Sequence, residues 1–98
     1  MSLYTSLSPQ ALEDVFGIWG YIAAHDEAVA DAFIERIFDV IHILEQHPQM
    51  GRLRVEFKRK PRSIAVESYN VFYRVLSSGR IIVIRILHGT RDIPPLFS

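Results

Sequence analysis

Two runs rich in β-branched and aromatic residues, 69–76 and 81–87, are separated by only four residues, Ser77-Ser78-Gly79-Arg80. Apolar runs joined by a short connection that contains glycine predict an antiparallel β-hairpin, here with a tight turn at Ser78-Gly79. A hairpin settles which side chains share a face of the sheet, because paired residues point to the same side. No other segment of the chain restricts the fold as strongly.

A turn at Ser78-Gly79 pairs Val75 with Ile82 and Phe72 with Arg85. One face of the hairpin is then entirely apolar, and we expect it to receive helices; it carries Val71, Tyr73, Val75, Ile82, Ile84 and Ile86. The opposite face places two arginines among apolar neighbours; it carries Phe72, Arg74, Leu76, Ile81, Val83, Arg85 and Leu87. A three-residue loop would instead turn the arginines toward the helices.

The first half of the chain has the spacing of two helices. Ser8 can cap the first helix and Pro9 suits its first position, where a backbone N–H is not needed. The second helix is expected to begin at Asp26 and to run to about His47, before Pro48. Its apolar surface is so wide that it should pack on both the first helix and a sheet. Gly17 and Gly20 weaken the first helix, so we expect a close neighbour there; its apolar stripe is Leu12, Val15, Phe16, Trp19, Ile22 and Ala23.

Alternation at Leu3, Thr5 and Leu7 adds a short N-terminal strand, and 63–66 adds another strand before the hairpin. The sequence therefore predicts an α+β fold: an N-terminal strand, an antiparallel helix hairpin and a three-stranded antiparallel sheet packed on the helices. With 98 residues, of which 49% are hydrophobic, the chain can bury one core, so we expect a single domain over 1–98.

Composition excludes several classes of protein. The chain has no cysteine, which removes disulfides and thiolate chemistry. No apolar stretch approaches the roughly 20 residues that span a bilayer, and the first residues lack the pattern of a signal peptide. We expect a cytoplasmic protein without membrane association, metal or cofactor.

The zero net charge conceals two oppositely charged halves. Residues 1–50 hold eight acids and one base, whereas 51–98 hold ten bases and three acids. Six of those bases fall in 52–62 with only Glu56 against them, which is typical of an exposed connection or edge strand. Such a surface attracts phosphate or an acidic protein segment. Phe57 is the only aromatic residue there, so a platform for stacking nucleic-acid bases is not evident.

Arg74 and Arg85 are the first candidates for a functional role. They either pair with carboxylates such as Glu56, Glu67 or Asp92, or they form a basic surface for phosphate or a partner's carboxylates. Both roles are compatible.

His88 and Arg91 are weaker candidates for catalysis. A histidine and an arginine close together could act as general acid and phosphate clamp in RNA cleavage. Alternatively, Gly89 supplies a turn and the Arg91-Asp92 neighbourhood caps the sheet. The other histidines lack metal-ligand spacing and are expected on the surface; they are His25, His42 and His47.

Five segments, in this order, carry a resemblance to a known family. They are 7–11 with 18–22 (Leu-Ser-Pro-Gln-Ala and Ile-Trp-Gly-Tyr-Ile), 47–52 (His-Pro-Gln-Met-Gly-Arg), 71–75 (Val-Phe-Tyr-Arg-Val) and 84–92 (Ile-Arg-Ile-Leu-His-Gly-Thr-Arg-Asp). Together with the order of the expected elements, they resemble the ParE branch of the RelE/ParE superfamily of toxins from bacterial toxin-antitoxin modules.

The resemblance implies a toxin held inactive by a ParD-type antitoxin, which has a ribbon-helix-helix DNA-binding half and a C-terminal part that wraps the toxin. It also implies a role in plasmid stabilisation and contact with DNA only through the antitoxin. ParE relatives poison DNA gyrase by binding, whereas RelE relatives cut mRNA on the ribosome with basic residues and a tyrosine or histidine. Here both lysines precede the sheet and no tyrosine follows Tyr73, which favours the gyrase branch over a hydrolase. A third possibility is a decayed toxin that only stabilises its antitoxin.

An amphipathic, partly acidic antitoxin segment is expected to bind the open sheet face and the basic stretch. The apolar residues would supply contact area and the arginines would set register and orientation. The expected contacts are Phe72, Arg74, Leu76, Val83, Arg85, Arg52, Arg54, Arg59 and Arg62. The apolar surface of the second helix offers an additional docking place.

Overall fold

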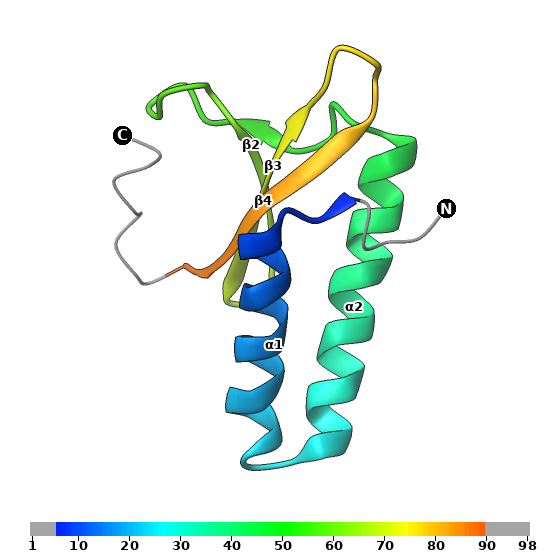
Figure 1. Cartoon of the computed structure of the whole chain (residues 1–98), viewed down its shortest axis with the longest axis vertical. Helices are drawn as coiled ribbons and strands as arrows, with labels where there is room; N and C mark the ends of the chain where they lie inside the picture. Colours follow the sequence, from blue (N-terminus) through cyan, green and yellow to red (C-terminus); the bar gives the residue numbers. More distant parts are fainter. Residues whose placement is uncertain (1–5, 90–98) are drawn as a thin grey trace.

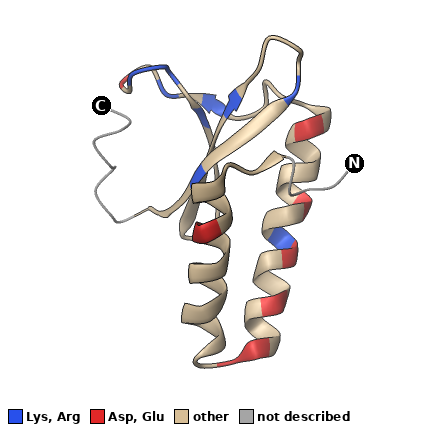
Figure 2. Cartoon of the chain, in the orientation of Figure 1, with Lys and Arg blue, Asp and Glu red and all other residues tan. Residues whose placement is uncertain are grey.

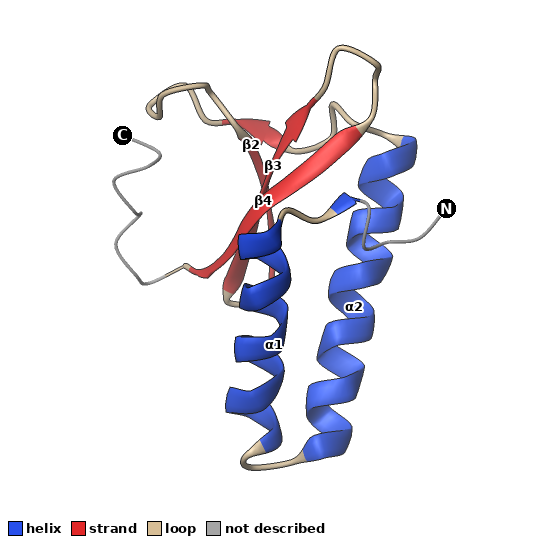
Figure 3. Cartoon of the chain, in the orientation of Figure 1, coloured by secondary structure: helices blue, strands red, loops and turns tan. Residues whose placement is uncertain are grey.

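The computed structural model of the chain describes residues 6–89. The elements, in chain order, are α1 (Pro9–Ala23), α2 (Glu27–Gln46), β1 (Arg52–Leu53), β2 (Arg62–Val66), β3 (Tyr69–Val75) and β4 (Ile81–His88). The strands form one antiparallel sheet in the order β1-β2-β3-β4, and the helices form a hairpin beside it (Figures 1 and 3). The predicted α+β fold is confirmed, with the two-residue strand β1 as an addition to the three predicted strands. No helix within 6–89 is long and apolar enough to cross a membrane.

Both helices begin where the sequence predicts. The Ser8 hydroxyl accepts a hydrogen bond from the Ala11 N–H at 3.0 Å, and Pro9 follows the cap. The Asp26 carboxylate accepts from the Val29 N–H at 3.1 Å and caps α2. These contacts satisfy backbone donors that the first turn of a helix leaves unpaired.

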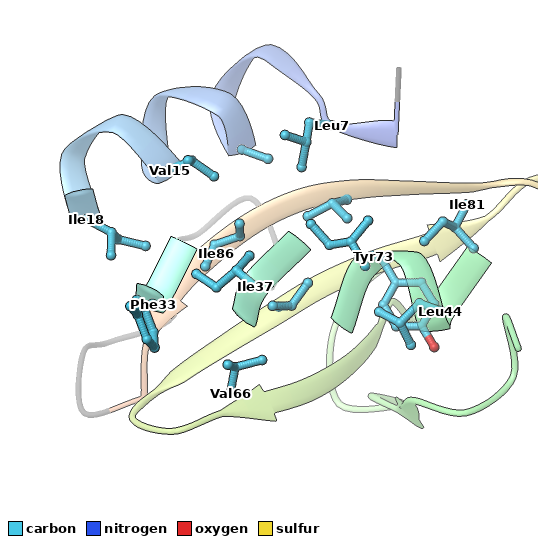
Figure 4. Packing of buried hydrophobic residues seen from close by; sticks show 14 residues of the cluster. Leu7, Val15, Ile18, Phe33, Ile37, Leu44, Val66, Tyr73, Ile81 and Ile86 are labelled. Atoms are coloured by element: carbon cyan, nitrogen blue, oxygen red, sulfur yellow. The ribbon is translucent and has the colours of Figure 1, made fainter. Parts of the chain in front are cut away.

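α2 packs on both α1 and the sheet, as its wide apolar surface predicts. Its buried residues are Ala30, Phe33, Ile37, Ile41 and Leu44. They meet α1 residues such as Val15 and Ile18 and the strand residues Tyr73 and Ile86 in one core (Figure 4). Burying each large apolar side chain contributes about 1.5–3 kcal/mol, so this cluster is the main source of stability.

The close neighbour expected at Gly17 and Gly20 is absent from the described chain. A β-carbon added at either glycine meets nothing within 4 Å, and both glycines are exposed. That expectation is wrong, because α1 turns its Ala11, Val15 and Ile18 face inward and its glycines outward.

The predicted register of the hairpin is correct at the end far from the turn and wrong near the turn. Phe72 pairs with Arg85 as predicted, but Tyr73 pairs with Val83 and Val75 with Ile81. The connection is the three-residue loop 77–79, in which Gly79 has a φ of 88°, and the Leu76 N–H donates to the Arg80 carbonyl at 2.7 Å. This loop is one residue longer than the predicted two-residue turn and would reverse the faces of β4, but a bulge restores them beyond Val83.

The bulge decides which side chains face the helices. Ile81 and Val83, predicted on the open face, are buried in the core, whereas Ile82, predicted on the helix face, is opposite Arg74. Arg85 keeps its predicted place on the face of Phe72 because it lies beyond the bulge.

The chain before α1 covers the outer edge of β4. Leu7 forms a parallel bridge with Val83, and the Ser8 N–H donates to the Val83 carbonyl at 2.8 Å. The predicted N-terminal strand is thus represented by Leu7, while Leu3 and Thr5 lie outside the described residues. β4 is therefore protected from pairing with another strand, and β1 forms the opposite edge of the sheet.

Candidate functional site

The loop between β1 and β2 folds back onto the sheet face that the helices leave uncovered. Ser63, Phe72 and Arg85 lie opposite one another across three strands of this face. The Phe57 ring packs at 6.2 Å from the Phe72 ring, and the Arg54 guanidinium lies 5.5 Å from the Phe72 centroid. Phe72 is consequently 0% exposed, so it is not available as the surface contact that the sequence predicted.

Arg54 holds this loop in place. Its guanidinium donates to the Ser63 hydroxyl at 3.0 Å and to the Glu56 carboxylate at 2.8 Å. The backbone N–H of Glu56 itself, and then Arg54, lower the pKa of the Glu56 carboxyl. The predicted pairing of Glu56 with Arg74 or Arg85 is therefore wrong, since the loop brings Arg54 to it first.

Arg85 is clamped to α1. Its Nε and Nη2 donate to the two oxygens of Asp14 at 2.8 and 3.1 Å, and Asp14 Oδ2 also accepts from the Ile86 N–H at 2.9 Å. The hydrogen bond to Asp14 raises the pKa of Arg85. Arg85 pairs with a carboxylate as one interpretation predicted, but Glu67 pairs with Arg36 and Asp92 lies outside the described residues.

This clamp leads to a prediction about stability. The Asp14 and Arg85 side chains are only 16% and 22% exposed, so removing one charge leaves the other poorly solvated. We expect Asp14→Asn to lower the free energy of unfolding by about 1–2 kcal/mol, measured by urea denaturation. The neighbouring exposed Glu13→Gln is the control and should shift it by less than about 0.5 kcal/mol. If both variants lowered the free energy of unfolding equally, the contact between Asp14 and Arg85 would not be the source of the stability.

Tyr73 organises the loop that connects α2 to β1. Its hydroxyl donates to the Pro48 carbonyl and accepts from the Gly51 N–H, both at 2.8 Å. Burial raises the pKa of Tyr73, which keeps the hydroxyl protonated for the first of these bonds. Arg62 Nη1 donates to the Gly51 carbonyl at 2.8 Å and Nη2 to the Gln49 side chain at 2.6 Å. Residues 47–51 are thus a loop that leads into β1, and Tyr73 and Arg62 of the sheet hold it in place.

The nine predicted antitoxin contacts fall into three groups. Phe72 and Val83 are buried. The side chains of Arg54, Arg62 and Arg85 are engaged within the chain. The remaining four are exposed, namely Arg52, Arg59, Arg74 and Leu76.

Most of the exposed basic residues gather at one end of the molecule. Figure 2 shows Lys and Arg along the β1–β2 loop and the neighbouring strand ends, with most of the Asp and Glu on the helices. The opposite charges of the two halves of the sequence therefore become separate regions of the surface. Exposed apolar side chains accompany the basic ones near β1; they are Met50, Leu53 and Val55. Cations and apolar area together suit an acidic amphipathic partner.

A groove of ≈ 750 Å³ lies between α1 and the end of β4. His88 and Arg85 line it with Tyr69, and the His88 ring packs edge-on against Tyr69 at 5.2 Å. Arg91, the proposed companion of His88, lies outside the described residues. The other three histidines are exposed, as predicted, and within 6–89 no three potential ligands are grouped to hold a metal.

The sequence model of one family, described as "ParE toxin of type II toxin-antitoxin system, parDE", matches residues 6–93. The chain belongs to this family. Among curated relatives, Toxin ParE1 of Mycobacterium tuberculosis is 29% identical over 96 residues, which cover 95% of this chain and 96% of that protein. Toxin ParE3 of Caulobacter vibrioides is 34% identical over 65 residues, or 66% of this chain and 64% of that one. The resemblance inferred from the sequence is confirmed, and the chain is a ParE-family toxin of a type II toxin-antitoxin system.

Two residues important for this ParE-family toxin were not identified as such from the sequence. Asp14 sits among inward-facing Ala11, Val15 and Ile18, and an acid in an apolar helix stripe is a signal that it has a partner. The sequence around Gly51 contains no pattern that reveals its close contact with Tyr73; Gly51 was noted only as part of the 47–52 segment.

Proposed function

We propose that this toxin acts by binding DNA gyrase and is neutralised by a ParD-like ribbon-helix-helix antitoxin in the bacterial cytoplasm. The observation that carries the proposal is that two side chains an RNA-cleaving site could have used, Tyr73 and Arg85, are engaged in structural bonds. The Tyr73 hydroxyl is bonded to Pro48 and Gly51, and the Arg85 guanidinium to Asp14. Groups held in structural bonds are poorly placed to serve as an acid, a base or a phosphate clamp.

The antitoxin surface that we propose is narrower than the sequence predicted. It consists of Arg74 and Leu76 at the end of β3, and Arg52 and Leu53 on the edge strand β1, all of them exposed. Apolar contact supplies area here, and the guanidinium groups fix the orientation of an acidic segment. Phe72 and Arg54, whose guanidinium lies 5.5 Å from the Phe72 ring, support this surface from within the molecule.

A ribosome-dependent mRNA endonuclease is the second candidate. One observation favours it: His88 and Arg85 line the same groove, so an imidazole and a guanidinium face one open space. RNA cleavage needs a group that transfers a proton and a cation near the phosphate. Arg85 is already paired with Asp14, which weakens this candidate.

A paired assay separates the candidates. Purified toxin is added to gyrase supercoiling and DNA-cleavage reactions and, in parallel, to a translation reaction with mapping of mRNA ends. We expect trapped gyrase-DNA complexes and intact transcripts, and His88→Ala should retain full gyrase inhibition. Cut transcripts that disappear with His88→Ala would replace the proposal with the endonuclease, and inactivity in both reactions would indicate a decayed toxin.

A further inference from the structure

The tip of the β1–β2 loop carries three consecutive cations, Lys58, Arg59 and Lys60. All three are exposed, and none makes an ion pair or a side-chain hydrogen bond with any residue in 6–89. Glu56, the one acid of this loop, is bonded to Arg54. The charge of the tip is therefore not neutralised by the residues around it.

The backbone of the tip is held in a conformation that large residues avoid. Arg59 has a φ of 64° and Lys60 a φ of 45°, both in the left-handed region where glycine is the least strained residue. Two neighbouring residues with long side chains in this conformation lower the stability of the fold relative to two glycines. Backbone strain of this kind is concentrated at functional sites, which makes the tip a candidate for one.

The base of the loop is well fixed beneath the cations. The Arg54 N–H donates to the Pro61 carbonyl at 2.8 Å, and the Lys60 N–H donates to the Phe57 carbonyl at 3.1 Å. The Phe57 ring packs on the buried Phe72, and the Arg54 guanidinium stacks on Phe57 at 4.9 Å. The tip is thus presented on a preformed support, which lowers the entropy lost on binding.

We propose that Lys58, Arg59 and Lys60 bind the phosphate backbone of duplex DNA directly. The three tip residues are all cations, whereas the exposed apolar residues Leu53 and Val55 lie at the base of the loop. The nearest ring, Phe57, packs on Phe72, so the tip itself suits neither an apolar peptide nor stacked single-stranded bases. Closely spaced cations are what sequence-independent contact to the phosphates of a duplex requires. The acidic helices would keep the rest of the molecule away from the DNA (Figure 2).

The inference goes beyond the proposed function, because it concerns the toxin and DNA without gyrase or antitoxin. It also departs from the sequence-based expectation that the toxin meets DNA only through its antitoxin. If gyrase is the target, the tip would contact the DNA duplex that gyrase itself holds.

The test is fluorescence anisotropy of a labelled duplex of arbitrary sequence with full-length toxin, titrated at several salt concentrations between about 50 and 200 mM. Three phosphate contacts predict that log K falls with log salt with a slope of about −2.7. Lys58→Gln with Lys60→Gln should flatten the slope by about 1.8 and weaken binding at low salt about tenfold. The matched control, Arg36→Gln with Arg80→Gln, removes the same charge on α2 and the β3–β4 turn and should leave the slope unchanged.

A second variant separates binding from folding. Arg59→Gly relieves the strain and should unfold at the same or a higher urea concentration while binding DNA more weakly. An unchanged slope in the lysine double variant, or an equal loss in the charge-matched control, would overturn the proposal. The proposal would also be overturned if the lysine double variant bound polyglutamate more weakly but bound DNA with unchanged affinity, because the tip would then recognise acidic protein. Because gyrase is absent from this assay, its outcome is independent of the gyrase test.

Discussion

Replacing Gly51 with alanine should lower the free energy of unfolding by about 2–4 kcal/mol. A β-carbon at Gly51 would lie 2.5 Å from the Tyr73 hydroxyl oxygen, 2.7 Å from its Cε1 and 3.0 Å from the Ser63 carbonyl oxygen. Tyr73 cannot swing away, because its ring is in the core and its hydroxyl is bonded to Pro48. The clash would also disturb the hydrogen bond from the Gly51 N–H to the same hydroxyl.

The same substitution at Gly17 is the control and should have the opposite sign. Gly17 lies inside α1, exposed, with open space where a β-carbon would go. Alanine there should raise the free energy of unfolding by about 0.5–1 kcal/mol, because glycine is a poor helix former. Urea denaturation followed by circular dichroism measures both variants. Two changes of equal sign and size would mean that Tyr73 does not fix the 47–52 loop.

The helices could be predicted because their signals are local. Ser8 caps α1 and Asp26 caps α2, as predicted. A cap could be predicted because it depends only on a side chain and a backbone N–H three positions further along the chain. The apolar spacing of α2 likewise reports directly which residues are buried.

The hairpin register could be predicted only in part, because two local irregularities act together. A loop one residue longer than the predicted two-residue turn shifts the pairs near the turn, and a bulge in β4 cancels the shift. Apolar residues occupy both faces of these strands, so the pattern could not show that Ile81 and Val83, and not Ile82, enter the core.

The candidate site was less predictable than the fold, because its contacts join distant segments. Arg85 meets Asp14 across 71 positions, and the loop residues Arg54 and Phe57 cover Phe72. Neither contact produces a regular spacing of residues in the sequence, so neither could be predicted from periodicity. The exposed candidates Arg74 and Leu76 were identified correctly as surface residues because they lie where the helices do not reach.

Reversing the charge of Arg74 should weaken antitoxin binding at least about 100-fold, or about 2.7 kcal/mol. Arg74 is exposed on β3 opposite Ile82, and it has no ion pair or side-chain hydrogen bond with the described residues. Glutamate at this position would repel an acidic antitoxin segment at the centre of the proposed surface. Because the side chain is exposed, the fold should tolerate the change, and circular dichroism can verify this.

Arg36→Glu is the matched control for charge. Arg36 is exposed on α2 and pairs only with the exposed Glu67, so its reversal changes the net charge equally but away from the proposed surface. We expect it to change antitoxin affinity by less than about threefold.

The most direct test is the affinity of purified toxin for the proposed ribbon-helix-helix antitoxin, measured by isothermal titration calorimetry for the original chain, Arg74→Glu and Arg36→Glu. We predict tight binding by the original chain and by Arg36→Glu, and a loss of two orders of magnitude or more for Arg74→Glu. A folded Arg74→Glu toxin that binds this protein as tightly as the original chain would contradict the proposal that the exposed basic end of the sheet receives the antitoxin.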